Sequence, residues 1–145
     1  MPVDSKHREY TERMTEWEML ADIKAGEGTV KAKGTEYLPK LSGQKDKEYK
    51  AYLERGTFYG ATARTITGLS GAVMRKPPRQ EAPREVMDHL ERITSEGTSM
   101  KEMLQSVVEA VISFGRYGVL VDYADDGQAG RPYLTEYPAT DILIV

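Results

Sequence analysis

The sequence predicts an α+β fold, with several helices packed on a small antiparallel sheet. Three observations lead to this prediction. Apolar residues recur at helical spacing along most of the chain up to Phe114. Two short runs with the composition of strands follow, at residues 119–123 and 133–137. Between the two patterns lies Gly-Arg-Tyr-Gly, residues 115–118, which places glycine where a helix must end and a strand begin.

The first element expected is an N-terminal helix within residues 1–25. Several of its side chains share one face at i, i+4 and i+7 spacing: Tyr10, Met14, Trp17, Ala21 and Lys24. Asp4 or Ser5 is placed to cap the start of this helix, and Gly26 is placed to end it. Residues 26–44 are rich in glycine and lysine, and we expect them to form a loop.

Residues 45–114 are expected to be the helical part of the chain. A helical pattern runs from about Asp46 to Met74. Its predicted buried stripe consists of Tyr49, Tyr52, Leu53, Tyr59, Ala63, Ile66, Leu69 and Val73. Gly56 and Gly60 predict a kink or a break, because glycine inside a helix costs about 1 kcal/mol relative to alanine. The Arg-Lys-Pro-Pro sequence that follows ends the pattern, since proline lacks an amide donor.

Two further helices are expected before the strands. The first is short and covers residues 83–93. The second starts at a capping box formed by Ser99 and Glu102. Its apolar stripe is the most regular in the chain and consists of Met100, Met103, Leu104, Val107, Val108, Val111 and Ile112. We expect the last four of these to be buried against the strand that carries Val119 and Val121.

Residues 115–145 are expected to form strands. An eight-residue hairpin loop, Ala-Asp-Asp-Gly-Gln-Ala-Gly-Arg, joins the two strand patterns. The final run, residues 141–145, is apolar, and an exposed apolar strand edge invites aggregation. We therefore expect this run to pair as a strand, either beside residues 133–137 or with chain beyond Val145. The same run predicts that the sheet is incomplete at the C-terminus of this sequence.

Charge is distributed unevenly along a chain whose net charge is only −3. Residues 1–23 hold three basic and six acidic side chains, a net charge of −3. Residues 24–84 hold thirteen basic and six acidic side chains, a net of +7, and residues 85–145 hold four and eleven, a net of −7. This separation suits a protein that meets its own copies or a charged partner in a fixed orientation. Solvated faces of unrelated helices are the competing interpretation.

The strongest local excess of basic charge lies in residues 56–84, where Glu81 is the only acid. The five basic residues are Arg64, Arg75, Lys76, Arg79 and Arg84. We name them the basic segment and treat them as candidate contacts to DNA or to a neighbouring subunit. The acids expected opposite them in a neighbour are Asp88, Glu91 and Glu109. A plain solvated patch stays an equal alternative.

No pattern in the sequence predicts a catalytic site. The chain has no cysteine, which excludes disulfides and thiolate metal sites. Residues 28–35 resemble a phosphate loop, but the lysine precedes the last glycine instead of following it. Residues 68–71 are one residue short of a nucleophile elbow. His7 and His89 have no ligand or nucleophile spacing. We therefore expect no enzyme activity and no cofactor, with a small enzyme domain as the least favoured alternative.

The acids of the hairpin loop imitate a calcium loop. Asp122, Asp125 and Asp126 precede Gly127, but Ala124 and Tyr133 occupy positions where such a loop needs ligands. Ordinary turn acids are the favoured interpretation and a metal site the weaker one. The chain also lacks an N-terminal signal peptide pattern and any apolar run of about 20 residues, so we expect a soluble protein with no membrane contact.

Three stretches together resemble a known family. They are YLPKLSGQKDKEYKAYLERGTFYGATARTITGLSGAVMRKPP, SFGRYGVLVDY and RPYLTEYPATDI. In this order they are similar to the N-terminal part of tailed-phage portal proteins, especially to portal-like phage and prophage proteins of unknown function. The resemblance extends over residues 17–142. It rests on a helix that ends in a basic-Lys-Pro motif, a long helix, the Gly-Arg-Tyr-Gly turn and two strands.

The resemblance implies a structural function. Portal subunits form a ring, usually a dodecamer, at one vertex of the capsid, and double-stranded DNA passes through it without sequence specificity. The packaging motor (terminase), the capsid and the neck proteins are the implied partners. The implied location is the virion, with the host cytoplasm during assembly. This chain would correspond to a portal wing-like region. The alternative is an interaction or adaptor domain of a phage or prophage that forms no ring.

Overall fold

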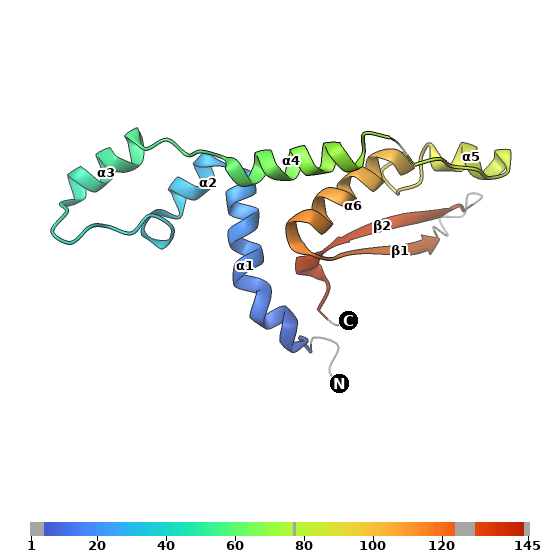
Figure 1. Cartoon of the computed structure of the whole chain (residues 1–145). Helices are drawn as coiled ribbons and strands as arrows, with labels where there is room; N and C mark the ends of the chain where they lie inside the picture. The colour runs from blue at the N-terminus through green and yellow to red at the C-terminus, as the bar shows by residue number, and fades with distance from the viewer. Residues whose placement is uncertain (1–4, 77, 124–129, 144–145) are drawn as a thin grey trace.

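The computed structural model describes residues 5–76, 78–123 and 130–143. Within them, six α-helices pack with one two-stranded antiparallel sheet, which confirms the predicted α+β fold class. Helix α1 (Arg8–Ala25) runs through the middle of the molecule, and α4 (Ala61–Val73) lies across its C-terminal end. Helix α6 (Met100–Phe114) lies beside both (Figure 1). The molecule is elongated, because elements extend to both sides of α1.

Helix α1 is capped by His7 at its start and by Gly26 at its end. Its N-cap is His7, whose Nδ1 accepts a hydrogen bond from the Glu9 amide at 3.3 Å. The N-cap is therefore not Ser5, which we predicted as one of two candidates and which lies three positions before the helix. Asp4, the other candidate, lies outside the described residues. Gly26 ends the helix with a φ of 105°, a backbone conformation that favours glycine, as predicted.

Residues 26–44, which we expected to form a loop, contain regular structure. Helix α2 (Glu27–Ala32) and a 3₁₀ turn, η1 (Gly34–Glu36), follow α1 directly. Six residues are too few for the apolar periodicity of α2 to stand out, although its Val30 is buried. Together with α3 (Asp46–Arg55) and residues 56–58 they form an arm, residues 27–58, which projects to one side of α1 (Figure 1).

The break predicted near Gly56 and Gly60 is confirmed, since α3 ends at Arg55 and α4 begins at Ala61. The predicted buried stripe is largely wrong. Ile66 is buried, whereas four members of the stripe are exposed: Tyr52, Tyr59, Leu69 and Val73. Tyr52 lies on α3, which the break turns away from the rest of the molecule, whereas Leu69 and Val73 lie on α4, which buries Ile66 and Ser70 instead.

The two later helices form where predicted, as α5 (Arg84–Leu90) and α6. The capping box of Ser99 and Glu102 is present, and Gly115 ends α6 in the left-handed conformation with a φ of 80°. The predicted packing of α6 is wrong. Val107, Val108 and Ile112 are only partly buried and Val111 is 44% exposed, because α6 packs on α4 and α1 and its buried residue is Met103.

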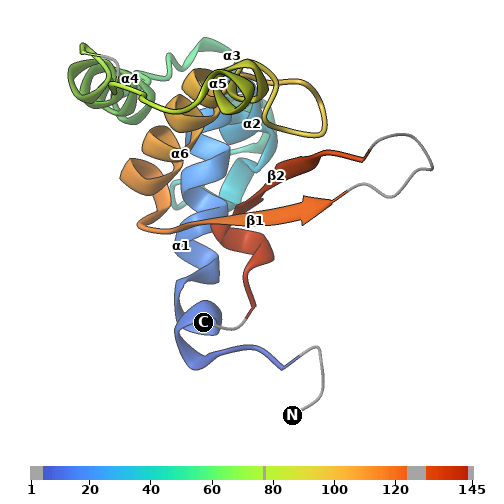
Figure 2. The same cartoon turned by 90° about the vertical axis from the view of Figure 1, so that its right-hand side faces the viewer.

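The sheet consists of β1 (Tyr117–Tyr123) and β2 (Pro132–Pro138), which confirms both predicted strands. They pair antiparallel without a bulge, with Tyr117 opposite Pro138 and Tyr123 opposite Pro132. The hairpin extends away from α6 (Figure 2), which explains why Val119 and Val121 are 45% and 68% exposed. Most of the predicted hairpin loop, residues 124–129, lies outside the described residues.

The C-terminal run does not pair with β2 as we expected. Residues 139–141 form a 3₁₀ turn, η2 (Ala139–Asp141), and Leu143 packs beside α1. The Leu143 carbonyl accepts a hydrogen bond from the His7 amide at 2.9 Å, so this part of the backbone is satisfied without a strand partner. Residues 144–145 lie outside the described residues.

The core of the described residues is small. Its main cluster consists of Tyr10, Trp17 and Ala139, with Met14, Phe114 and Leu143 packed against it. The rings of Tyr10 and Trp17 meet edge to face with their centroids 6.0 Å apart. This cluster joins α1 to the end of α6 and to the C-terminal turn, and it leaves the arm, α5 and the hairpin as peripheral elements.

Candidate assembly surface

The basic segment lies along α4 and the chain that follows it. Arg64 is on α4, Arg75 and Lys76 come directly after its end, and Arg84 is the first residue of α5. All five members, Arg79 included, are exposed. The segment therefore lies on the surface along α4 and the stretch of chain between α4 and α5.

Within the segment, two arginines have partners in the same chain. The Arg64 guanidinium lies 5.0 Å from the centroid of the Tyr59 ring, and that ring is 72% exposed. This cation–π pair presents a flat aromatic surface and a positive charge together at the start of α4. Arg79 forms an ion pair with Glu81, the only acid of this stretch. Exposed pairs of this kind contribute about 0–1 kcal/mol and leave the side chains available to other partners.

The acids expected in a neighbouring copy differ in their availability. Asp88 on α5 and Glu91 just after it are exposed. Glu109 on α6 lies 3.8 Å from the Lys24 ammonium of the same chain and is partly buried. The structure thus leaves Asp88 and Glu91 as the better candidates for a contact with the basic segment of another copy.

A polar contact that sequence reasoning missed attaches the arm to α1. The Asp22 carboxylate accepts hydrogen bonds from the Tyr37 hydroxyl at 2.6 Å and lies 3.2 Å from the Lys33 ammonium. The Tyr37 hydrogen bond, together with Lys33, lowers the pKa of Asp22 below its ordinary value of 3.8. The contact therefore favours the ionised carboxylate, and it is lost as the pH falls below that range. Its signal in the sequence is weak, because Asp22 and Tyr37 are fifteen residues apart.

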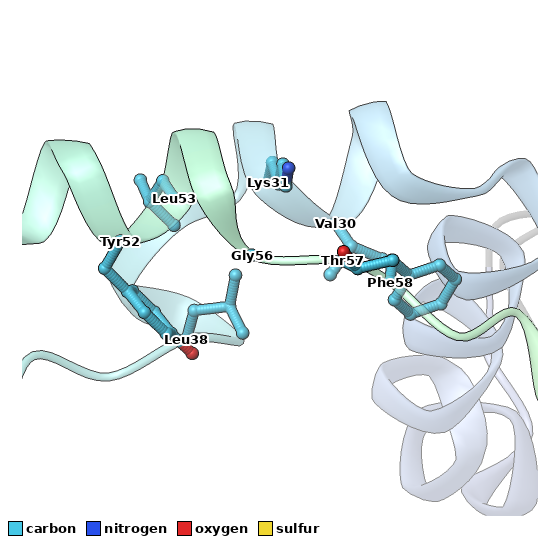
Figure 3. A pocket seen from close by; sticks show the side chains of 8 residues that line it. All are labelled: Val30, Lys31, Leu38, Tyr52, Leu53, Gly56, Thr57 and Phe58. Atoms are coloured by element: carbon cyan, nitrogen blue, oxygen red, sulfur yellow. The ribbon is translucent and has the colours of Figure 1, made fainter.

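The arm has a small apolar interior of its own (Figure 3). Its cavity of about 80 Å³ is lined by Val30, Lys31, Leu38, Tyr52, Leu53, Gly56, Thr57 and Phe58. The Tyr49 hydroxyl closes one side by donating to the Leu38 carbonyl at 2.8 Å. Pockets for small molecules usually measure about 300–1,000 Å³. This cavity is therefore the size of a packing gap within the arm and is smaller than the pockets that usually hold a cofactor.

Arg116 is a second residue that sequence reasoning did not single out. It lies in the Gly-Arg-Tyr-Gly turn, and its guanidinium covers the Trp17 ring at 4.5 Å from the centroid. Its Nη2 donates to the carbonyls of Ile142 at 2.8 Å and Ala139 at 3.3 Å. The Trp17 indole in turn donates to the Phe114 carbonyl at 3.1 Å. This turn therefore fastens α6, β1, α1 and the C-terminal segment to one another.

In residues 5–76, 78–123 and 130–143, no three His, Asp or Glu side chains come together as metal ligands do. The Asp122 carboxylate accepts from the Tyr123 amide and the Tyr133 hydroxyl, while Asp125, Asp126 and Gly127 lie outside the described residues. No helix of the described part is long and apolar enough to span a bilayer.

No family model matches this chain, and no curated protein matches it either.

Proposed function

We propose that this chain is a structural subunit that assembles with its own copies into a ring of the phage-portal type. In such a ring it would form part of the conduit through which double-stranded DNA is packaged and ejected. The proposal includes the capsid, the terminase motor and the neck proteins as partners, and the capsid vertex as the location. It assigns the chain no enzymatic reaction.

The observation that carries this proposal is the large surface of the chain. The chain exposes 10761 Å². A compact monomer of its mass, 16.3 kDa, exposes about 7,500 Å². Several large apolar or aromatic side chains are exposed, among them Leu41 in the arm, Tyr59 before α4, and Val119, Val121 and Tyr123 in β1. Apolar surface of this extent favours burial against partners.

The separation of charge supports contacts between different faces of two copies. The chain from residue 24 to 84 carries a net +7 and the chain from residue 85 onward a net −7. Opposite charges on different parts of one subunit favour a head-to-tail contact, and like charges disfavour a contact of identical faces. Head-to-tail contacts produce closed rings when the rotation between subunits closes. Within these regions we assign the contact to the exposed Arg75 and Lys76, just after α4, and to the exposed acids Asp88 and Glu91 on and after α5.

Charge reversal in the basic segment tests the proposal. The double variant Arg75→Glu, Lys76→Glu should raise the dissociation constant of assembly roughly thirtyfold, because two exposed ion pairs contribute about 1 kcal/mol each. Lys47→Glu, Lys50→Glu is the matched control, since it makes the same charge change at two exposed lysines of the arm. Asp88→Lys, Glu91→Lys should restore assembly of the first variant. Equal assembly of both double variants at low salt would contradict the proposal.

A further inference from the structure

Strand β1 forms one edge of the sheet. The sheet has two strands, and the outer side of β2 is partly covered. There the Leu134 amide donates to the Ile93 carbonyl at 2.8 Å, and Thr94 forms an isolated parallel β-bridge with Leu134. No described residue pairs with the outer side of β1. A hairpin of two strands is only marginally stable by itself in water.

The Leu134 hydrogen bond shows which backbone groups of β1 face outward. In an antiparallel pair, the N–H and C=O of one residue point to the same side. The backbone N–H and C=O of Leu134 point toward Ile93 and away from β1. Val121 is the partner of Leu134 in the register, so the backbone N–H and C=O of Val121 point away from β2. By alternation, the backbone groups of Tyr117, Val119 and Tyr123 also face the open edge. The Tyr123 amide agrees with this assignment, since it bonds to the Asp122 side chain at 2.7 Å.

The edge lacks the features that usually prevent strand addition. Natural edge strands are protected by lysine, proline or a bulge. Strand β1 has none of these, and its seven residues pair with β2 without interruption. Its exposed side chains are apolar on both faces: Val119 at 45%, Leu120 at 50% and Val121 at 68%. Asp122 is its one charged residue.

We propose that the open edge of β1 pairs antiparallel with β1 of a second copy. Centred on Leu120, this register uses all seven residues, brings Val119 opposite Val121 and places the outward backbone groups of both strands face to face. Asp122 then lies opposite Gly118 of the other copy, so the two carboxylates do not meet. The contact is two-fold, buries the exposed apolar side chains and converts two hairpins into one four-stranded sheet. It does not involve the basic segment and goes beyond the proposed ring contact.

Cysteine crosslinking tests this register directly, because the chain has no native cysteine. Leu120 would face Leu120 of the second copy as a non-hydrogen-bonded pair, with the Cα atoms about 4.5 Å apart. This distance lies within the range that a disulfide requires. Leu120→Cys should therefore form a covalent dimer under mild oxidation on the order of a hundredfold faster than Val111→Cys, a control of similar exposure on α6. Equal rates for the two variants would overturn the proposal.

A backbone variant distinguishes strand pairing from nonspecific hydrophobic association. Val121→Pro removes an outward amide and leaves the bonds between β1 and β2 unchanged, since proline is tolerated at strand edges. In the Leu120→Cys background it should abolish the fast crosslinking, whereas Val121→Thr should retain it. Circular dichroism checks that the proline variant stays folded. A further variant, Val121→Lys, keeps the amide but adds a charge at the edge, and it should also slow the crosslinking. Crosslinking that persists in both the proline and the lysine variants would exclude strand pairing.

Discussion

At the scale of single residues, Arg116 joins α1 to the C-terminal segment. It covers Trp17 on α1 and donates to two carbonyls of the C-terminal segment. A planar guanidinium suits this position because it can stack on an aromatic ring and donate in its own plane at the same time. The small core of the molecule depends on this one cation as well as on apolar packing.

Replacing Arg116 tests that role. Arg116→Gln should lower the free energy of unfolding by roughly 2–4 kcal/mol, because it removes the short charged hydrogen bond to Ile142, which contributes about 1.5–3 kcal/mol, and a cation–π contact of about 0.5–1 kcal/mol. Arg8→Gln, on the exposed side of α1, should change stability by about 0.5 kcal/mol or less. Urea denaturation followed by Trp17 fluorescence measures both. A stable Arg116→Gln protein would show that the turn holds without the guanidinium.

At the scale of elements, the end of α6 determines the direction of the hairpin. Gly115 adopts a φ of 80° and directs the chain from the helix into β1. Because β1 then leaves α6 at once, the apolar residues of the strand and of the outer face of α6 stay exposed. The geometry of one turn thus decides how much surface remains for partners.

A pair of glycine substitutions measures this conformational demand. Gly115→Ala should destabilise the chain by roughly 1–2 kcal/mol, because a side chain disfavours the left-handed region. Gly68→Ala, in the middle of α4, should stabilise it by about 1 kcal/mol, since no atom lies within 4 Å of the added methyl group. The melting temperature and the urea midpoint should therefore both fall for Gly115→Ala and both rise for Gly68→Ala. The same sign for both variants would contradict the assigned end of α6.

Local signals predicted the elements better than their packing. The capping box at Ser99, the helix end at Gly115 and the two strands have short-range causes, and all of them were predicted correctly. Burial of Val111 was predicted wrongly, because periodicity identifies an apolar face but not the element that covers it. The attachment of the arm through Asp22 and Tyr37 and the role of Arg116 depend on residues far apart in the chain. No spacing rule indicates such contacts.

At the scale of the whole molecule, three features favour the proposed assembly of copies: the elongated shape, the small core and the separated charge. The arm and the hairpin extend to opposite sides of α1, and both carry exposed apolar side chains. A chain that exposes 10761 Å² as a monomer gains stability when copies cover part of that surface. We therefore propose that the assembly, and not the single chain, is the stable form.

The mass of the wild-type chain in solution tests this claim most directly. Light scattering should give a multiple of 16.3 kDa at low ionic strength, about 0.01 M, where charges interact over roughly 30 Å. Ring contacts between opposite charges should weaken at about 1 M salt, where screening reduces that distance to roughly 3 Å. The account predicts a large assembly at low salt that dissociates to smaller species, dimers included, at high salt. A mass of 16.3 kDa under both conditions would contradict it.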